Sequence, residues 1–353
     1  MSVSRKDARG VDARGVDARG VDAPVLELSQ LHVRFAVPHG EVHAVRGLDL
    51  RVARGEVAAV VGESGSGKSA AMLAVLGLLS PNASVTGSVK VDGQEILGAP
   101  GGVLRKMRGG RLGMIFQDPM TSLNPVLRVG RQLAEAVITH QKVNPKQAEA
   151  KAVELLEMVS IPNAKVRVRS YPHEMSGGMR QRVMIAMAMA NNPQLIIADE
   201  PTTALDVTIQ AQILQVLARL RAEQGVSMVL ITHDLGVVAG LADTVHVMYA
   251  GKVVERGPVD ELFKRSEHPY TRGLLDCLPR LDRRDADLVP IGGTSPSMRD
   301  EFVGCSFAPR CPFVVPRCRE EEPLLRPVAT TEAACHLSPL PTRVTPLEMG
   351  VRR

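Results

Sequence analysis

The strongest constraint on the fold of this 353-residue chain is the glycine-rich stretch GESGSGKS at 62–69. A continuous apolar run, EVAAVV, precedes it, and a stretch of helical character, AAMLAVLGLL, follows it. A strand, a loop of the pattern GxxxxGK[ST] and a helix, in that order, form a cradle in which backbone N–H groups surround phosphate oxygens. The sequence therefore predicts a phosphate-binding loop, made of Gly62, Glu63, Ser64, Gly65, Ser66, Gly67, Lys68 and Ser69.

Two side chains of this loop, and two acids further along the chain, have the chemistry that a nucleoside triphosphate requires. In loops of this pattern the lysine, here Lys68, reaches the outer phosphates, and the next hydroxyl, here Ser69, binds Mg²⁺. In LIIADE, four apolar residues place Asp199 at the carboxyl end of a buried strand, where ligands of open α/β sheets collect. We expect Asp199 to hold Mg²⁺ through water and Glu200 to polarise the attacking water. Two acids after a strand are otherwise typical of a helix cap, but the phosphate loop favours the catalytic interpretation.

Strands and helices alternate along most of the chain. Two strands of alternating polarity precede the phosphate loop, and buried strands are expected at 111–116, 194–200 and 228–234, with a helix between the last two. Residues 128–160 have helical periodicity and no strand signal. This order predicts an α/β fold, with a β-rich nucleotide-binding lobe and a helical subdomain inserted at about 119–190.

The two ends of the chain differ in composition from the α/β part, which we place at 25–275. Residues 7–23 repeat the unit DARGV, in which the charges cancel and the apolar content is too low for a core. We therefore expect a disordered tail at 1–24. Residues 276–353 are rich in Pro, Arg and Cys and have little periodicity, so a second, small, cysteine-containing domain is predicted there.

Charge and hydropathy exclude several classes of protein. The net charge of +5 is mild and includes no basic block of the kind that binds nucleic acid. No apolar run approaches the roughly 18 residues of a membrane span. The N-terminus has no apolar signal core, so the sequence predicts a cytosolic location, and any work at a membrane would depend on the spans of a partner.

A second candidate anion site occurs in HEMSGGMRQRV at 173–183. Ser176, Gly177 and Gly178 form a turn at the start of a predicted helix, where exposed backbone N–H groups favour an anion. Because the phosphate loop already supplies a cradle, a second site for the same nucleotide requires another explanation.

The motifs GESGSGKS, MSGGMRQRV, LIIADEPTTALD and THD, in this order, resemble those of the ATP-binding subunits of ABC transporters, over roughly residues 26–270. The resemblance implies that the Ser-Gly-Gly turn binds the γ-phosphate of ATP on an opposing subunit. The working unit would then be a dimer that encloses two nucleotides, which explains the second anion site.

The resemblance also implies roles for single residues. Gln117 in MIFQDP matches the glutamine that contacts Mg²⁺ and links the site to the membrane partner. Asp206 matches the loop that meets the opposite phosphate site, and His233 matches the histidine that contacts the γ-phosphate. Phe35 lies where the family places an aromatic ring against adenine, although a core position is the alternative. The signature departs from the common LSGGQ at Met179, which stands in place of the glutamine.

The second half of the chain indicates a subfamily. HPYT, GGTSP and GCSFAPRCPFVVPRC, with MSGGM and FQDPMTSLNP upstream, resemble the D-type ATPase of oligopeptide and dipeptide importers. The resemblance implies a heterodimer with a second ATPase, two membrane permeases and an external peptide-binding protein, with this chain peripheral on the cytoplasmic face of the membrane.

Two other functions stay open at this point. The nearest alternative is the ATPase of an importer for nickel or another small solute, against which the long cysteine-bearing tail speaks. A non-transport ABC ATPase acting on nucleic acid or the ribosome usually has two cassettes in one chain, a long coiled-coil insertion or a pronounced basic surface. The sequence has none of these features, so peptide import is favoured.

Four of the five cysteines lie between 305 and 335: Cys305, Cys311, Cys318 and Cys335. Four thiolates are what a [4Fe–4S] cluster needs. Structural zinc also accepts four thiolates, but its cysteine pairs are usually about two to four residues apart, which does not occur here. The resemblance also points to a cluster. Four reduced thiols packing a small lobe are the remaining alternative, because disulfides are disfavoured in the cytosol.

Overall fold

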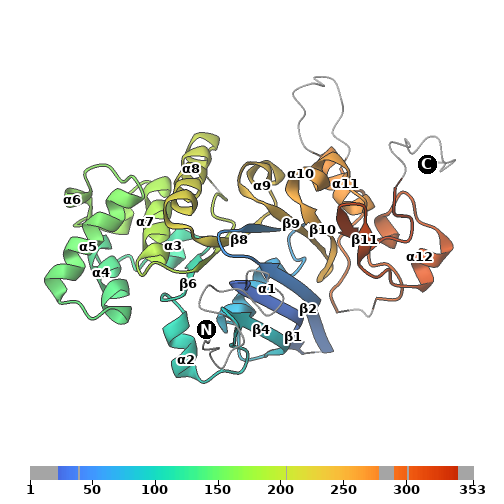
Figure 1. Ribbon diagram of the computed structural model, residues 1–353, viewed down its shortest axis with the longest axis horizontal. Helices are drawn as coiled ribbons and strands as arrows, with labels where there is room; N and C mark the ends of the chain where they lie inside the picture. The colour runs from blue at the N-terminus through green and yellow to red at the C-terminus, as the bar shows by residue number, and fades with distance from the viewer. Residues whose placement is uncertain (1–22, 39, 204, 278–289, 300–301, 341–353) are drawn as a thin grey trace, which may run out of the picture.

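The computed structural model describes residues 23–38, 40–203, 205–277, 290–299 and 302–340 (Figure 1). The repeat predicted to form a tail therefore lies outside the described residues, as do parts of the C-terminal segment.

Among the described residues, the larger sheet has eight strands, and it carries the phosphate loop. Its order is β11-β12-β10-β9-β3-β8-β7-β6. The block from β9 to β6 is parallel, and β10, β12 and β11 extend it by antiparallel pairing. All residues of β3, β7 and β8 are buried, as expected for parallel strands covered on both faces. The strands are β3 (Val57–Val61), β6 (Leu112–Ile115), β7 (Leu195–Asp199), β8 (Ser227–Thr232), β9 (Thr244–Tyr249), β10 (Lys252–Pro258), β11 (Arg326–Val328) and β12 (Thr331–Ala333).

A smaller antiparallel sheet forms the β-rich lobe predicted from the alternating segments. Its order is β2-β1-β4-β5, and the hairpin between β1 and β2 closes with Val37 opposite Gly40. Its inner face packs with the first helix and one face of the larger sheet in a single apolar core. The strands are β1 (Leu26–Val37), β2 (Gly40–Val52), β4 (Ala83–Val91) and β5 (Gln94–Glu95).

A run of helices without a strand separates β6 from β7, as predicted from the periodicity. In Figure 1, α4 and α5 lie at one end of the molecule, and α7 lies between them and the sheet. Asn144 and Gln147 form a reciprocal capping box at the start of α5, which explains why that helix begins there. The helices are α3 (Pro119–Ser122), α4 (Val129–His140), α5 (Pro145–Met158), α6 (Ala164–Arg167) and α7 (Gly177–Met189), with a short 3₁₀ turn at Pro172–Glu174.

The remaining helices connect the strands of the larger sheet or follow it. Helix α1 begins at Lys68, within the phosphate loop, and ends at Leu76, followed by the cap Gly77 in the left-handed conformation that favours glycine. Helix α8 begins after the cap Asp206. The helices are α1 (Lys68–Leu76), α2 (Gly101–Met107), α8 (Val207–Gln224), α9 (Leu235–Leu241), α10 (Val259–Lys264), α11 (Pro269–Asp276) and α12 (Pro316–Glu320).

The separate small domain predicted at 276–353 is not confirmed. Strand β12 pairs with β10 of the larger sheet, so that Ala333 lies opposite Glu255. Phe307 is buried against Tyr249 and Tyr270 and belongs to the main core. A segment with so few apolar residues has little core of its own and is stabilised by packing on the α/β part.

Candidate active site

The phosphate loop follows β3 and leads into α1, and two of its glycines are required by their surroundings. Gly62 and Gly67 have φ of 150° and 99°, in the region that favours glycine. A Cβ on Gly62 would lie 2.2 Å from the carbonyl oxygen of Met248, and one on Gly67 would lie 2.1 Å from that of Ala44. The loop is therefore held between β9 and β2, with the N-terminus of α1 at its centre, where backbone N–H groups favour an anion.

Lys68 lies inside the curve of the loop. Its side chain is 5% exposed, and its Nζ donates to the carbonyl oxygens of Gly62 and Glu63, both at 2.8 Å. Burial lowers the pKa of Lys68, while the carboxylates of Glu200, Asp199 and Glu63 act in the opposite direction. The ammonium group therefore lies inside the loop, bonded to two backbone carbonyls, and its contact with phosphate stays a prediction.

Ser69 and Asp199 are brought together from α1 and β7. The Ser69 hydroxyl donates to Asp199 Oδ1 at 3.0 Å. Burial raises the pKa of Asp199, against the effect of this hydrogen bond. A hydroxyl and a carboxylate oxygen are ligands suited to Mg²⁺, which is usually bound by one or two carboxylates together with substrate phosphates. The donor set therefore fits the predicted ion.

Glu200 is held by three side chains from three different segments. Gln117 Nε2 and Thr203 Oγ1 donate to Oε2 at 3.0 and 2.8 Å, and His233 Nδ1 lies 3.2 Å from Oε1. Burial raises the pKa of Glu200, but the hydrogen bonds from Thr203 and His233 outweigh it and the pKa is lowered. Because an ionised carboxylate only accepts, His233 donates from Nδ1. Glu200 also has φ of 46°, a strained conformation for this residue of the kind that gathers at active sites.

The Ser-Gly-Gly turn begins α7, as predicted. Ser176 is the N-cap, and its Oγ accepts from the Met179 N–H at 3.4 Å. Ser176 and Gly177 are exposed, whereas a Cβ on Gly178 would lie 2.5 Å from Ile209 of α8. Within the residues that the structure describes, no hydrogen bond joins this turn to the phosphate loop.

Asp206 and Phe35 each have a structural role that does not require ATP. The carboxylate of Asp206 caps α8 by accepting the N–H of Ile209 at 2.9 Å, and the residue is exposed. Phe35 is half-buried on β1 and packs on the edge of the core below the smaller sheet. The roles predicted for both residues toward ATP stay predictions.

Three contacts of the site were not predicted from the sequence. Thr203 bonds to Glu200, as described above. Arg310 forms two hydrogen bonds to Glu63 of the phosphate loop, and the Tyr270 hydroxyl accepts the Glu63 N–H at 2.9 Å. Arg310 and Tyr270 belong to the APRC and HPYT motifs, which the sequence analysis used only as family markers. Their presence in such motifs is the signal that could have indicated a role.

The structure does not support the predicted iron–sulfur ligand set. Within the described part of the chain, no group of three or more His, Cys, Asp or Glu side chains is placed to hold a metal ion. Burial raises the pKa of Cys305 to about 11 and that of Cys311 to about 12, and Cys318 and Cys335 contribute to both shifts. This environment favours the neutral thiol over the thiolate that a metal ligand requires.

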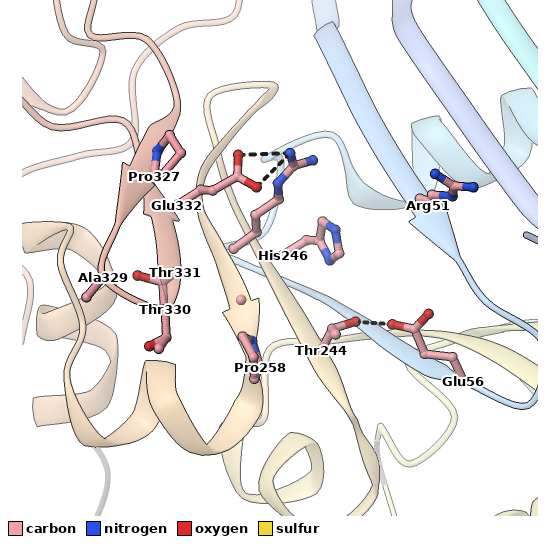
Figure 2. A pocket seen from close by; sticks show the side chains of 12 residues that line it. Arg51, Glu56, Thr244, His246, Pro258, Pro327, Ala329, Thr330, Thr331 and Glu332 are labelled. Atoms are coloured by element: carbon pink, nitrogen blue, oxygen red, sulfur yellow. Dashed lines mark hydrogen bonds and ion pairs between the residues drawn. The ribbon is translucent and has the colours of Figure 1, made fainter. Parts of the chain in front are cut away.

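A separate hollow of about 490 Å³ lies at the opposite ends of the strands from the phosphate loop (Figure 2). Thr244 and Glu56, at the beginnings of β9 and β3, are joined by a hydrogen bond of 2.6 Å, and Arg256 pairs with Glu332 at 2.9 Å. Because these polar groups bond to one another and lie far along the strands from Lys68, we assign this hollow no part in the nucleotide site.

The phosphate loop, the Asp199–Glu200 pair and the serine-capped helix α7 together define an ATP-binding cassette. Residues 45–203 match the family described as ABC transporter, and residues 254–318 match the oligopeptide/dipeptide transporter C-terminal region. The fold is similar to a dimeric bacterial ABC transporter cassette, with a TM-score of 0.60 and 28% identity, covering 66% of this chain and 98% of that chain.

Curated relatives agree with this class and narrow it. An oligopeptide transport ATP-binding protein of Haemophilus influenzae, OppD, is 48% identical over 84% of this chain and 92% of the relative. A dipeptide transport ATP-binding protein of Bacillus subtilis, DppD, is 49% identical over 82% of this chain and 87% of the relative. The chain belongs to the family of ATP-binding subunits of oligopeptide and dipeptide ABC transporters, as the sequence motifs predicted. OppD of Mycobacterium bovis is 53% identical over 88% of this chain, which spans 52% of that relative's length.

Proposed function

We propose that this chain hydrolyses ATP to drive the import of oligopeptides or dipeptides through a membrane ABC transporter. The observation that carries the proposal is the position of Glu200. Its ionised carboxylate is held by Gln117, Thr203 and His233, directly after Asp199, which bonds to Ser69 of the phosphate loop.

Each of these residues has a role in the proposed reaction. Backbone N–H groups of the loop and the Lys68 ammonium bind the β- and γ-phosphates of ATP. Ser69 and Asp199 would hold Mg²⁺, with Gln117 beside them, and the ion would neutralise charge on the phosphates. Glu200 accepts a hydrogen bond from the attacking water and orients it toward the γ-phosphate. His233 fixes Oε1 of Glu200, and its largely exposed ring, 61% accessible, is available to the γ-phosphate.

A second subunit is needed to complete the site. The exposed Ser176 and Gly177 at the start of α7 and the exposed Asp206 would meet the ATP bound by an opposing ATPase. A dimeric cassette of similar fold has been solved with ADP and phosphate bound, which supports this arrangement. As the resemblance of the motifs implies, we propose a heterodimer with a sister ATPase, and Phe35 as the ring that stacks on adenine.

Exposed apolar side chains next to Gln117 support docking on a membrane partner. Phe116, Met120 and Val126 are exposed, although they are apolar. Among the residues that the structure describes, no helix is both long and apolar enough to cross a bilayer. We therefore propose that two permease subunits bind here, that the chain is peripheral on the cytoplasmic face, and that an external protein supplies the peptide.

The cysteine-rich segment adds a separate proposal. Four cysteines between 305 and 335 match the number of thiolates that a [4Fe–4S] cluster needs, and on this ground alone we propose a cluster as the brace of the segment, against the arrangement of the described side chains. Anaerobic purification should then give brown protein with broad absorbance near ~400 nm and about four irons per chain. A colourless, folded, iron-free preparation would exclude the cluster.

Purification of the intact complex tests the main proposal. Mass spectrometry of the complex should find a sister ATPase, two permeases and a retained peptide, and ATP turnover should be low for the isolated chain and rise on assembly. Retained nickel or another small solute would favour the alternative importer, and copurifying nucleic acid or ribosomal protein would favour a non-transport role. High turnover from a proven monomer would contradict the dimer.

A further inference from the structure

The phosphate loop contains a carboxylate, Glu63, whose two oxygens are both held by the C-terminal segment. Arg310 Nη1 donates to Oε2 at 2.8 Å, and Nη2 donates to Oε1 at 2.9 Å. The Ser295 hydroxyl donates to Oε2 at 2.5 Å. A bidentate pair of this kind is stronger and more directional than a single contact between charged groups.

Contacts other than those to Glu63 also hold the Arg310 side chain in place. Its side chain is 6% exposed, its Nε donates to the Gly292 carbonyl at 2.9 Å, and its guanidinium lies 5.8 Å from the centre of the Tyr249 ring. It ends the short turn Ala308–Arg310, which follows Phe307 in the main core. The pair is therefore unlike a surface ion pair, in which two mobile side chains lose entropy to meet.

Glu63 is in turn connected to Lys68, which is expected to bind the phosphates. The Glu63 carbonyl accepts from Lys68 Nζ at 2.8 Å, and the Glu63 N–H donates to Tyr270 of α11 at 2.9 Å. The side chain, the N–H and the carbonyl of one residue thus join the C-terminal segment, α11 and the phosphate-binding lysine.

A carboxylate in a loop that binds a triphosphate is electrostatically unfavourable unless it is neutralised. Hydrogen bonds from Arg310 lower the pKa of Glu63, and this outweighs the effect of burial, so that the group is ionised. If the guanidinium were absent, the negative charge of Glu63 would act on the same Lys68 ammonium and on the incoming phosphates, because these groups interact through space.

We propose that Arg310 is a positioning residue of the nucleotide site: it neutralises Glu63 and thereby keeps the charge of Lys68 available to the phosphates of ATP. The C-terminal segment would then be part of the ATP site and would not serve only as a brace. This inference rests on the proposed function, because it assumes that the loop binds ATP.

Equilibrium binding of ATP to the full-length chain tests the proposal with two variants, one that removes the positive charge of the pair and one that removes the negative charge. Arg310→Met should raise the Kd for ATP on the order of tenfold, because it leaves the carboxylate unpaired beside the phosphates. Glu63→Gln should leave the Kd equal or lower it, because a free cation then faces the site. The double variant should recover most of the loss. Adenosine, which has no phosphate, should bind all three variants as it binds the wild type.

A matched control comes from the same segment. Arg317 is 62% exposed and pairs with Glu321, so Arg317→Met removes an arginine without touching the loop. Its Kd for ATP should be unchanged. In the assembled complex, Arg310→Met should raise KM more than it lowers kcat, since its effect is on phosphate binding.

The outcomes separate the inference from the proposed function. Lys68→Ala must weaken ATP binding, and if it does not, the proposed function itself fails. If Lys68→Ala weakens binding but folded Arg310→Met binds ATP like the wild type, only the inference is overturned. The inference also fails if the double variant binds as weakly as Arg310→Met, which would indicate a purely structural role. If Arg310→Met does not fold, the Kd of Glu63→Gln for ATP tests the inference. A tenfold loss of ATP affinity in that variant would contradict charge neutralisation.

Discussion

Replacing Glu200 by glutamine tests the proposed chemistry with little change in shape. Gln117 and Thr203 both donate to Oε2, and an amide oxygen can accept both of these bonds. Only the contact of 3.2 Å between His233 Nδ1 and Oε1 faces the new NH₂ group. Loss of one such bond changes stability by about 1 kcal/mol, so the variant should fold and bind ATP. The change that matters is the loss of the negative charge that polarises water.

The expected loss of turnover follows from that charge. General-base catalysis contributes about 10²–10⁴ in rate, or about 2.7–5.4 kcal/mol in the barrier. We expect Glu200→Gln to cut kcat in the assembled complex at least ~100-fold. Single-turnover release of phosphate measures the chemical step, and a parallel ATP titration measures binding. Glu223→Gln, an exposed acid near the end of α8, is the matched control and should retain full activity. Near-normal turnover of Glu200→Gln would refute the role of Glu200.

Three further predictions concern binding, packing and pH. Lys68→Ala should raise the Kd for ATP at least ~10-fold in an equilibrium titration, since it removes a charge-assisted bond to phosphate, and an unchanged Kd would contradict its role. Gly178→Ala should lower the free energy of unfolding by about 1–3 kcal/mol, because its Cβ would lie 2.5 Å from Ile209. Gly177→Ala is the control: it should leave the free energy of unfolding unchanged and lower only the ATP turnover of the complex. Burial raises the pKa of Glu255 to about 7 from 4.5, so the folded chain holds the proton more tightly. This stabilisation is present below pH ~4.5 and is lost as pH rises toward ~7, by about 3 kcal/mol, and denaturant titrations of Glu255→Gln should lack that slope.

The parts of the site that the sequence predicted are those that depend on near neighbours. The apolar run before GESGSGKS forms β3, whose residues are all buried, as a continuous apolar run predicts. Helix α1 then begins within the loop, at Lys68. Ser176 caps α7 through a bond to Met179, three residues away. These features depend on residues that are close in the sequence, so they can be predicted from the sequence alone. The helices between 119 and 189 could be predicted for the same reason.

Contacts between distant segments could not be predicted in this way. Glu63 and Arg310 are 247 positions apart, and their pairing depends on how Phe307 packs between Tyr249 and Tyr270. The separate C-terminal domain is not confirmed, and a change in composition could not reveal that β12 pairs with β10 of the larger sheet. No strand was expected at β4, β9 or β10, although β9 and β10 form a hairpin whose turn places Ala250 at φ 47° and Gly251 at φ 79°.

The segment that follows Glu200 contacts the Ser-Gly-Gly turn of the same chain. It thereby connects the residues proposed for this chain's own ATP with those proposed for the ATP of the opposing subunit. Thr203 bonds to Glu200 in the site that would hold this chain's own ATP, and the Leu205 N–H donates to the Thr202 carbonyl in the segment that follows. A Cβ on Gly177 would lie 3.7 Å from the Leu205 side chain, and one on Gly178 would lie 2.5 Å from that of Ile209. The turn that would bind the neighbour's γ-phosphate therefore rests on the same segment that carries Glu200, the residue proposed to polarise water. If the chain forms the proposed dimer, a displacement of this segment on ATP binding would change the packing of Leu205 and Ile209 against the start of α7.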